Sequence, residues 1–481
     1  MARFPDVHPL EMATQPGNKT SSFWRRWLSS LLAIVFSLTL LAQPAWAEST
    51  GCNVVLGWWE SPELQPVFTT TAPTTDCDFQ QWSWSAFVHY MQKTGPQGQP
   101  LFLSLRTSQD LERLASASEE TPSASPSTSP TAELLLAPRF QKPGLAVRGR
   151  QDEDLDSIKQ AGSNGILVDQ DSRVAYYSIH VNDDYFNFAK SHMGNEGYRK
   201  TLPTATFPVN ATVVKAAWRV IDAGSELPAD TFTTKATLQL LEKDPDHKGQ
   251  LRPSEQTKSG VTVALVGAHV VGVVENHPEF IWATFEQKNN TPNLPPGTTP
   301  ASGSPVSGQN FSFYKAGTTA ANSNQLPTAY SLNPKTQQVR LQTNIFRQFA
   351  YGGAEFSAES EKVSGLCRVA DIDSINANFQ AAIPEHSAKI DPVFANYNLI
   401  GSLWIDTKQT PLQPGLDLFA NSVGSIALAS STMESFVQGI GTNCFSCHTT
   451  QPFATKSEFA AKNIAISHII SGSLTRSPTH Q

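Results

Sequence analysis

A Cys-x-x-Cys-His motif near the C-terminus, in the stretch GTNCFSCHTT, constrains this chain more than any other feature. Only 33 residues follow it, since 481 minus 448 is 33. At this spacing the thiols of Cys444 and Cys447 can form thioethers with one haem, and the imidazole of His448 can bind its iron. The motif therefore predicts one covalently attached haem c, with His448 as the proximal iron ligand.

Three other sites also use two cysteines at this spacing: a redox-active dithiol, half of a zinc site and a structural disulfide. A zinc site needs a second pair of ligands, but Cys52, Cys77 and Cys367 each stand alone. A thioredoxin-like dithiol is expected early in a βαβ unit, whereas this motif lies near the C-terminus. Haem attachment is the interpretation that the spacing favours.

The N-terminus carries the features of an export signal. Arg25 and Arg26 precede an apolar run over residues 28–42, and an Ala-Trp-Ala sequence ends at Ala47. This predicts a signal peptide over residues 1–47, cleaved after Ala47, and a mature protein in the periplasm or another extracytoplasmic compartment. A retained anchor is the alternative, but the run is shorter than the roughly 20 residues of a span. A twin-arginine signal conflicts with haem attachment to an unfolded exported chain.

Cleavage leaves 434 residues, since 481 minus 47 is 434, enough for a large buried core. Charged residues make up 16% of the chain and the net charge is −7, so nothing indicates a nucleic-acid partner. No second apolar run reaches membrane-spanning length, and we expect no membrane span in the mature protein.

The other cysteines suggest one disulfide. Cys52 and Cys77 are close in sequence and would lie in an oxidising compartment, where a bridge between them persists. The alternative is two separate thiols. Cys367 is then left unpaired, and we expect it to be a small buried apolar side chain rather than a reactive thiol.

Composition divides the mature chain into four parts. Two stretches rich in Ser, Thr and Pro, residues 115–133 and 289–310, are typical of a linker and a long loop. The predicted organisation is an N-terminal segment over 48–114 with a helix near 78–93, the linker over 115–133, a β-rich body over 134–410 that contains the long loop, and a C-terminal haem segment over 411–481.

Strand patterns dominate the predicted body. Apolar or alternating runs rich in β-branched and aromatic residues occupy 173–182, 211–221, 231–241, 261–274, 279–287 and 398–406. Several of these runs are apolar throughout and are expected to be central strands. The fold class is therefore predicted as α+β, with a β-rich central body, flanking helices and a C-terminal haem-binding segment.

A helix is expected over residues 425–439, leading into the motif, with Leu428, Met433 and Phe436 packing on the haem. A small cytochrome c domain would then need a methionine ligand after the motif, yet no methionine follows His448. A free-standing domain of that kind is excluded, and the rest of the protein must cover the haem or leave it partly open.

The sixth iron position has several candidates. His468 follows His448 by 20 residues and ranks first, with an open position close behind. His269 lies within an apolar strand, where its ring nitrogens need partners. Met433 is the remaining alternative. Each of these residues can also be purely structural.

The chain resembles large secreted bacterial proteins of the cytochrome c family. The resemblance extends from about Cys77 to His468 and is carried by QQWSWSAFVHYM, VVKAAWRVI, FTTKATLQLL, LVGAHVVGVVENHPEFIWATFEQKNNTP, NLIGSLWID, STMESFVQ and NCFSCH. It implies that the β-rich body and the haem segment form one architecture. It assigns a role only to Cys444, Cys447 and His448, and it implies no substrate.

Three functions are compatible with these features. The sequence favours electron transfer to a redox partner protein, with the haem covered by the β-rich body. The first alternative is a haem-dependent oxidoreductase with an open sixth position, in which His269 and Glu286 could supply polar groups. The second is a ligand-binding or sensor protein with a structural haem.

Overall fold

The computed structural model describes Cys52 and residues 76–116, 134–138, 165–353, 369–407, 410–439, 441–452 and 459–474. All of them belong to one unit, residues 51–481. The expected signal peptide over 1–47, most of the expected linker over 115–133 and Cys367 lie outside the described residues.

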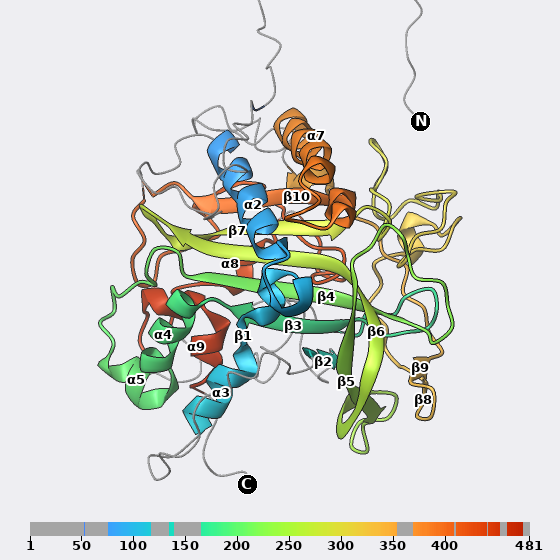
Figure 1. Ribbon diagram of the computed structural model, residues 1–481, viewed down its shortest axis with the longest axis horizontal. Helices are drawn as coiled ribbons and strands as arrows, with labels where there is room; N and C mark the ends of the chain where they lie inside the picture. Colours follow the sequence, from blue (N-terminus) through green and yellow to red (C-terminus); the bar gives the residue numbers. More distant parts are fainter. Residues whose placement is uncertain are drawn as a thin grey trace, which may run out of the picture. The chain divides into compact units, whose positions relative to one another are not determined.

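Within the described residues, nine strands form one sheet (Figure 1). Seven of them follow one another in antiparallel order: β1 (Arg106–Thr107), β3 (Tyr176–Val181), β4 (Thr212–Ile221), β6 (Leu251–Val274), β7 (His277–Gln287), β10 (Tyr397–Ile405) and β11 (Ser422–Gly424). The other two strands are β5 (Thr233–Lys243) and β2 (Leu134–Pro138). β5 pairs with β6, β2 pairs with β3, and β2 and β5 pair with each other in parallel. A separate hairpin consists of β8 (Leu332–Asn333) and β9 (Gln338–Val339).

All six expected strands are confirmed, and one is longer than predicted. The apolar run 261–274 forms only the second half of β6. Its first half, residues 251–260, is mostly polar and exposed, and pairs with β5. Because hydrogen bonds to a neighbouring strand do not require apolar side chains, the apolar pattern marked only the buried part of this strand.

Two helices cover one face of the sheet. The expected helix near 78–93 is confirmed as α2 (Asp76–Met91), and it packs beside α7 (Val369–Glu385) (Figure 1). Trp84 of α2 stacks on Phe379 of α7 with ring centroids 5.2 Å apart, and Phe87 stacks on Phe285 of β7 at 4.2 Å. Aromatic stacking of this kind adds to the area buried between the helices and the sheet.

The opposite face carries the C-terminal part of the chain. Along β7, Ala283 and Phe285 belong to the core under α2 and α7, while Trp282 packs with Phe445 and Ile466. Successive strand residues point to opposite faces, so β7 separates the two cores. The elements near this second core are α3 (Ser108–Ser116), α4 (Asp183–His192), α5 (Gly194–Lys200), α8 (Cys444–Cys447), the 3-10 turn η8 (Asn463–Ile466) and α9 (His468–Gly472).

The observed architecture is α+β with a β-rich body, as predicted. The expected long loop over 289–310 forms no helix or named strand. It is nevertheless anchored, because Val306 packs in a small core with Tyr314 and Phe346. The Tyr314 hydroxyl also accepts hydrogen bonds from the backbone amides of Val306 and Ser307.

The expected helix over 425–439 is wrong: these residues follow β11 and form a series of turns and irregular segments. Ser430, Ser431 and Thr432 explain the difference. The Ser430 hydroxyl accepts a hydrogen bond from the Thr432 amide, and the Ser430 amide donates to Glu434 Oε2 at 2.8 Å. Short polar side chains that bond to nearby backbone compete with the helix for those groups.

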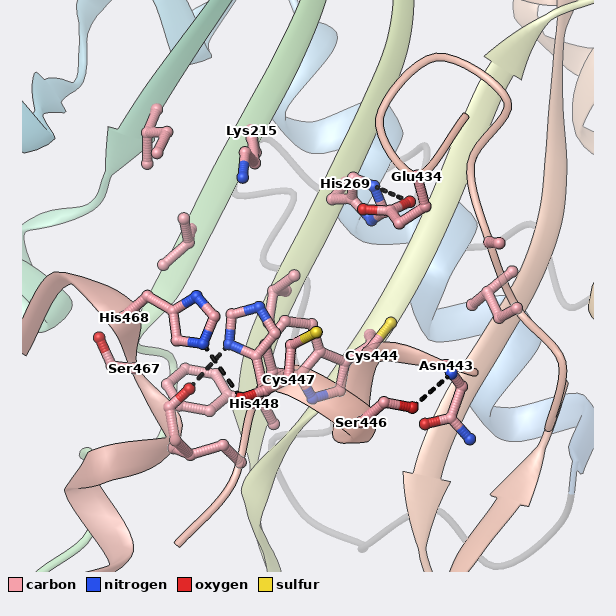
Figure 2. Close-up of a pocket in the computed structure, with 18 of the residues that line it drawn as sticks. Lys215, His269, Glu434, Asn443, Cys444, Ser446, Cys447, His448, Ser467 and His468 are labelled. Atoms are coloured by element: carbon pink, nitrogen blue, oxygen red, sulfur yellow. Dashed lines mark hydrogen bonds and ion pairs between the residues drawn. The ribbon is translucent and has the colours of Figure 1, made fainter. Parts of the chain in front are cut away.

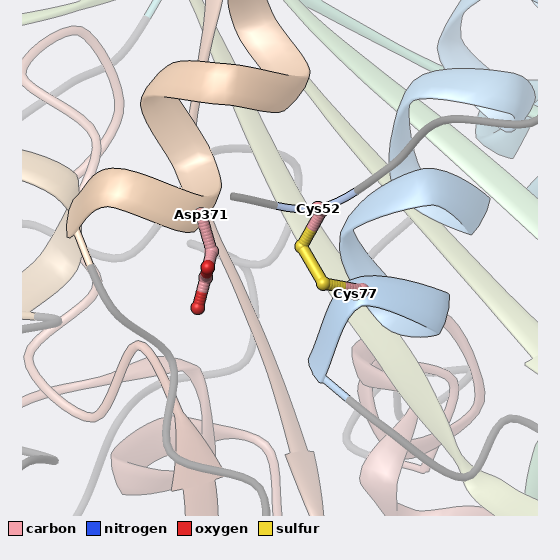
Figure 3. A group of neighbouring side chains, drawn as sticks. All are labelled: Cys52, Cys77 and Asp371. Carbon is pink, nitrogen blue, oxygen red and sulfur yellow. A yellow bond between two sulfur atoms is a disulfide. The ribbon is translucent and has the colours of Figure 1, made fainter. Parts of the chain in front are cut away.

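Cys52 and Cys77 form a disulfide, with Cα atoms 5.4 Å apart (Figure 3). Cys77 lies in the first turn of α2, and Asp371 of α7 is close to the bridge. The disulfide thus links Cys52 to helix α2, and it is the pairing that the sequence predicts.

Candidate functional site

A cavity lies between α8, η8 and the sheet face opposite α2 (Figure 2). The empty space within it is about 1070 Å³, a volume that includes space open to solvent. Its apolar walls come from Ile179, Tyr185, Val213, Val271, Phe280, Trp282, Leu428, Ala429, Val437, Ile466 and Ile469. Its polar groups come from Lys215, His269, Glu434, Thr442, Asn443, Cys444, Ser446, Cys447, His448, Ser467 and His468.

A capping box fixes the motif in place. Asn443 Oδ1 accepts a hydrogen bond from the Phe445 amide, and the Asn443 amide donates to Ser446 Oγ, both at 2.9 Å. The Asn443 side chain also donates to the Ile426 carbonyl oxygen, and Phe445 is buried in the core beneath. The two residues between the cysteines thus anchor the single turn α8, so that both cysteines border the cavity.

His448 is held in one orientation. Its Nδ1 lies 2.9 Å from the Ile466 carbonyl oxygen, to which it donates, so the lone pair is on Nε2. Its ring lies between Trp282, at 4.2 Å between centroids, and His468, at 3.9 Å. Burial, followed by the neighbouring His468, lowers the pKa of His448 well below its usual value, although the bond to Ile466 acts in the opposite direction. The imidazole is therefore neutral, the form that binds a metal.

Cys444 and Cys447 both carry thiols rather than a disulfide with each other. Burial, followed by the carboxylate of Glu434 and then by Cys447, raises the pKa of the Cys444 thiol well above its usual value. Cys444 is consequently a thiol rather than a thiolate in the folded chain.

His468 stands beside His448, not across the cavity from it. The two rings are nearly parallel, with an interplanar angle of 17°, and His468 Nε2 lies 3.2 Å from the Cys447 carbonyl oxygen. Two imidazoles bound to one iron from opposite sides point their nitrogens at each other and do not stack face to face. This arrangement disfavours His468, the first-ranked candidate, as the sixth ligand.

The other two candidates also have partners in the fold. His269 lines the cavity, but its Nδ1 lies 3.2 Å from Thr284 Oγ1 and its Nε2 lies 3.4 Å from Glu434 Oε2. Met433 is fully buried in a separate cluster with Tyr177 and Phe313 and does not line the cavity. Of the three residues expected to pack on the haem, only Leu428 lines the cavity.

Lys215 and Glu434 were not singled out by the sequence patterns, yet both line the cavity (Figure 2). Lys215 lies directly opposite His269 in the β4–β6 ladder. Burial acts to raise the pKa of Glu434, but His269, the Ser430 amide and Lys215 outweigh it and leave that pKa below its usual value. Glu434 is therefore a carboxylate. In the sequence, the signal for Lys215 is a charged residue within a mostly apolar strand.

Glu286, a candidate polar group for catalysis, does not line the cavity. It is fully buried and forms an ion pair with Arg347 at 2.5 Å, and it accepts a hydrogen bond from the Ser431 amide at 2.7 Å. Its role is to hold the turn that carries Glu434.

One further group of possible metal ligands occurs among the described residues, formed by Cys52, Cys77 and Asp371 (Figure 3). The two sulfur atoms are bonded to each other. Because metals bind thiolates in such sites, a disulfide beside one carboxylate is a poor metal site.

The residues around the main cavity fit a haem c. Two thiols and a neutral imidazole with its lone pair on Nε2 are the donor set that this group needs, and the surrounding walls are largely apolar. Cys444 and Cys447 would hold the porphyrin and His448 the iron.

No family model matches the chain, and neither a curated protein nor a solved structure matches it. Over the part of the chain that the structure describes, no helix has the length and apolar character needed to cross a membrane.

Proposed function

We propose that this chain is an exported c-type monohaem redox protein, with haem c attached to Cys444 and Cys447 and its iron bound by His448. The observation that carries the proposal is the orientation of His448. Its Nδ1 donates to the Ile466 carbonyl oxygen, which leaves Nε2 as the metal-binding nitrogen beside both cysteines and next to a largely apolar cavity. The resemblance to secreted cytochrome c family proteins supports the same assignment.

Within that class, the cavity favours a haem-dependent oxidoreductase with an exchangeable sixth iron position. Haem would supply one-electron chemistry when bound. The chain supplies orientation of the imidazole by Ile466 and Trp282, apolar walls that limit water, and polar groups on the sheet side of the cavity. The three candidates for the sixth position have other contacts. His468 stacks on His448, His269 lies between Thr284 and Glu434, and Met433 is buried in a separate cluster.

Electron transfer to a redox partner protein is the second candidate, and one observation favours it. Aromatic rings run from His448 to the surface near the end of α4. Successive centroids are 4.2, 6.2, 5.0, 4.6 and 4.0 Å apart along His448, Trp282, Phe280, Phe207, Phe188 and His192. Phe188 and His192 are partly exposed. An oxidoreductase also needs an electron supply, so the two functions share this path.

The spin state of the ferric iron tests the sixth position. We expect a high-spin absorption spectrum for the holoprotein, and no change of spin state in His468→Ala, because His468 lies beside His448. His269→Ala serves as the matched control from the sheet side. A low-spin wild-type spectrum that becomes high-spin in His468→Ala would contradict the open position and assign His468 to the iron.

Export is proposed from the N-terminal sequence alone. Cleavage after Ala47 predicts that the mature protein begins at Glu48 and is recovered from the periplasm or another extracytoplasmic compartment. N-terminal sequencing of the purified haem protein measures this directly. A haem-loaded chain that still begins at Met1 contradicts the export assignment.

A further inference from the structure

Lys462 is a buried lysine that the proposed function does not use. The residue is 6% exposed, and it lies directly before the turn η8. Its ammonium group donates hydrogen bonds to the carbonyl oxygens of Tyr198, Arg199 and Thr201, at the C-terminal end of α5. The last carbonyl groups of a helix have no partner within it and carry partial negative charge, so a cation is stabilised there. Lys462 therefore ties the start of η8 to the end of α5.

Further hydrogen bonds hold the residues around Lys462 against the same part of the chain. The Tyr198 hydroxyl donates to the Ala460 carbonyl oxygen at 3.0 Å. The Asn463 backbone amide donates to the Pro203 carbonyl oxygen at 2.9 Å, and the Asn463 side chain donates to the Thr204 carbonyl oxygen at 3.2 Å. We call these bonds, together with those of the lysine, the α5–η8 clamp.

The turn that follows the clamp carries the group that orients His448. The Ala465 amide donates to the Lys462 carbonyl oxygen at 3.0 Å, which joins the clamp to η8. At the end of η8, the Ile466 carbonyl oxygen accepts the hydrogen bond from His448 Nδ1 at 2.9 Å. Lys462 and Ile466 are four residues apart, since 466 minus 462 is 4. The clamp thus fixes the position of the acceptor that holds His448.

An acceptor at the outer nitrogen of an iron-bound imidazole also tunes the metal. The hydrogen bond from Nδ1 raises the basicity of Nε2, and a more basic ligand stabilises ferric iron relative to ferrous iron. A longer or weaker bond is therefore expected to raise the reduction potential. Because Ile466 contributes its backbone carbonyl group, the position of this acceptor depends on the residues that anchor η8.

We propose that Lys462 is a positioning residue that sets the reduction potential of the haem, by holding η8 so that the Ile466 carbonyl group stays within hydrogen-bonding distance of His448. The inference rests on the proposed function, because the potential belongs to the attached haem. It extends the redox centre to the α5–η8 clamp, although none of the described clamp residues lines the cavity.

The test measures the reduction potential of the holoprotein and, by NMR of its ferrous state, the rate at which the His448 Nδ1 proton exchanges with solvent. Lys462→Met removes the ammonium group and keeps a long side chain. It is expected to shift the ferric–ferrous equilibrium by about threefold or more towards ferrous iron, about 28 mV for one electron, and to speed the proton exchange. Lys462→Arg keeps the charge and the donors, and its potential is expected to stay close to that of the wild type.

Ser473→Ala is the matched control. The Ser473 hydroxyl accepts a hydrogen bond from the Gly194 amide at 2.7 Å, which joins the other end of α5 to the end of α9. This variant loses a contact between the same two segments beyond η8, and it is expected to keep the wild-type potential and exchange rate. Asn463→Ala removes a single side-chain donor of the clamp and is expected to raise the potential by less than Lys462→Met does.

Each other result has a defined meaning. A wild-type potential in Lys462→Met, or in Asn463→Ala where Lys462→Met does not fold, overturns the proposal. A raised potential with an unchanged exchange rate of the His448 Nδ1 proton overturns it as well, because the bond to Ile466 would not carry the effect. An equal rise in Ser473→Ala does so too, since general loosening of the C-terminal segment would explain it.

The haem content of every variant is measured first, so that failure of the inference and failure of the proposed function stay distinct. A wild-type chain without covalent haem contradicts the proposed function, and the inference falls with it. A haem-loaded wild type with an unchanged potential in the clamp variants contradicts the inference alone.

Discussion

Alanine at both Cys444 and Cys447 abolishes covalent haem attachment: after acid–acetone extraction, this double variant is expected to retain no haem, while the wild-type chain retains one per polypeptide. Thioethers to these two sulfurs are the only covalent bonds that the proposed function places between haem and protein. The measurement is the haem content of the denatured chain after expression with haem-maturation machinery.

Two controls make the result specific. Cys444→Ala alone leaves one thioether and is expected to keep haem on the denatured chain. Cys52→Ala with Cys77→Ala removes the same number of sulfur atoms but leaves the motif intact, so its haem stays attached. Haem that extracts from the wild type as readily as from the double variant contradicts the assignment of the motif.

Glu286→Ala is expected to lower the free energy of unfolding by about 3–5 kcal/mol, because it leaves Arg347 buried without its counter-charge. Glu286 is fully buried, and it also accepts hydrogen bonds from the amide and hydroxyl groups of Ser431. Urea denaturation followed by tryptophan fluorescence measures the change.

The matched control is Glu242→Ala, which breaks the exposed ion pair between Arg252 and Glu242. Exposed pairs contribute about 0–1 kcal/mol, so this variant is expected to unfold almost as the wild type does. Similar losses in both variants would show that the Glu286 pair does not hold the turn as described.

The sequence predicted the elements whose pattern is local. The strands from 211 to 287 carry runs of β-branched and aromatic residues, and α2 lies within one continuous segment with a helical pattern. The polar half of β6 and the turns over 425–439 were not predicted, because strand pairing and the side-chain bonds of Ser430 and Glu434 override local propensity there.

The candidate site was predictable only in part, for the same reason. Cys444, Cys447 and His448 are adjacent in sequence, and one covalent chemistry explains their spacing. Lys215 and His269 are 54 residues apart, since 269 minus 215 is 54, and only the register between β4 and β6 brings them together. The stacking of His468 on His448 likewise depends on the turn η8, which no sequence pattern indicated.

Mass spectrometry of the mature wild-type chain after acid–acetone extraction tests the central claim most directly. Peptides that span the motif are analysed together with the intact chain. The account predicts an intact mass equal to the polypeptide from Glu48 to Gln481 plus one haem, with the added mass on the peptide that contains Cys444 and Cys447. An intact mass equal to the bare polypeptide, with both cysteines unmodified, would contradict it.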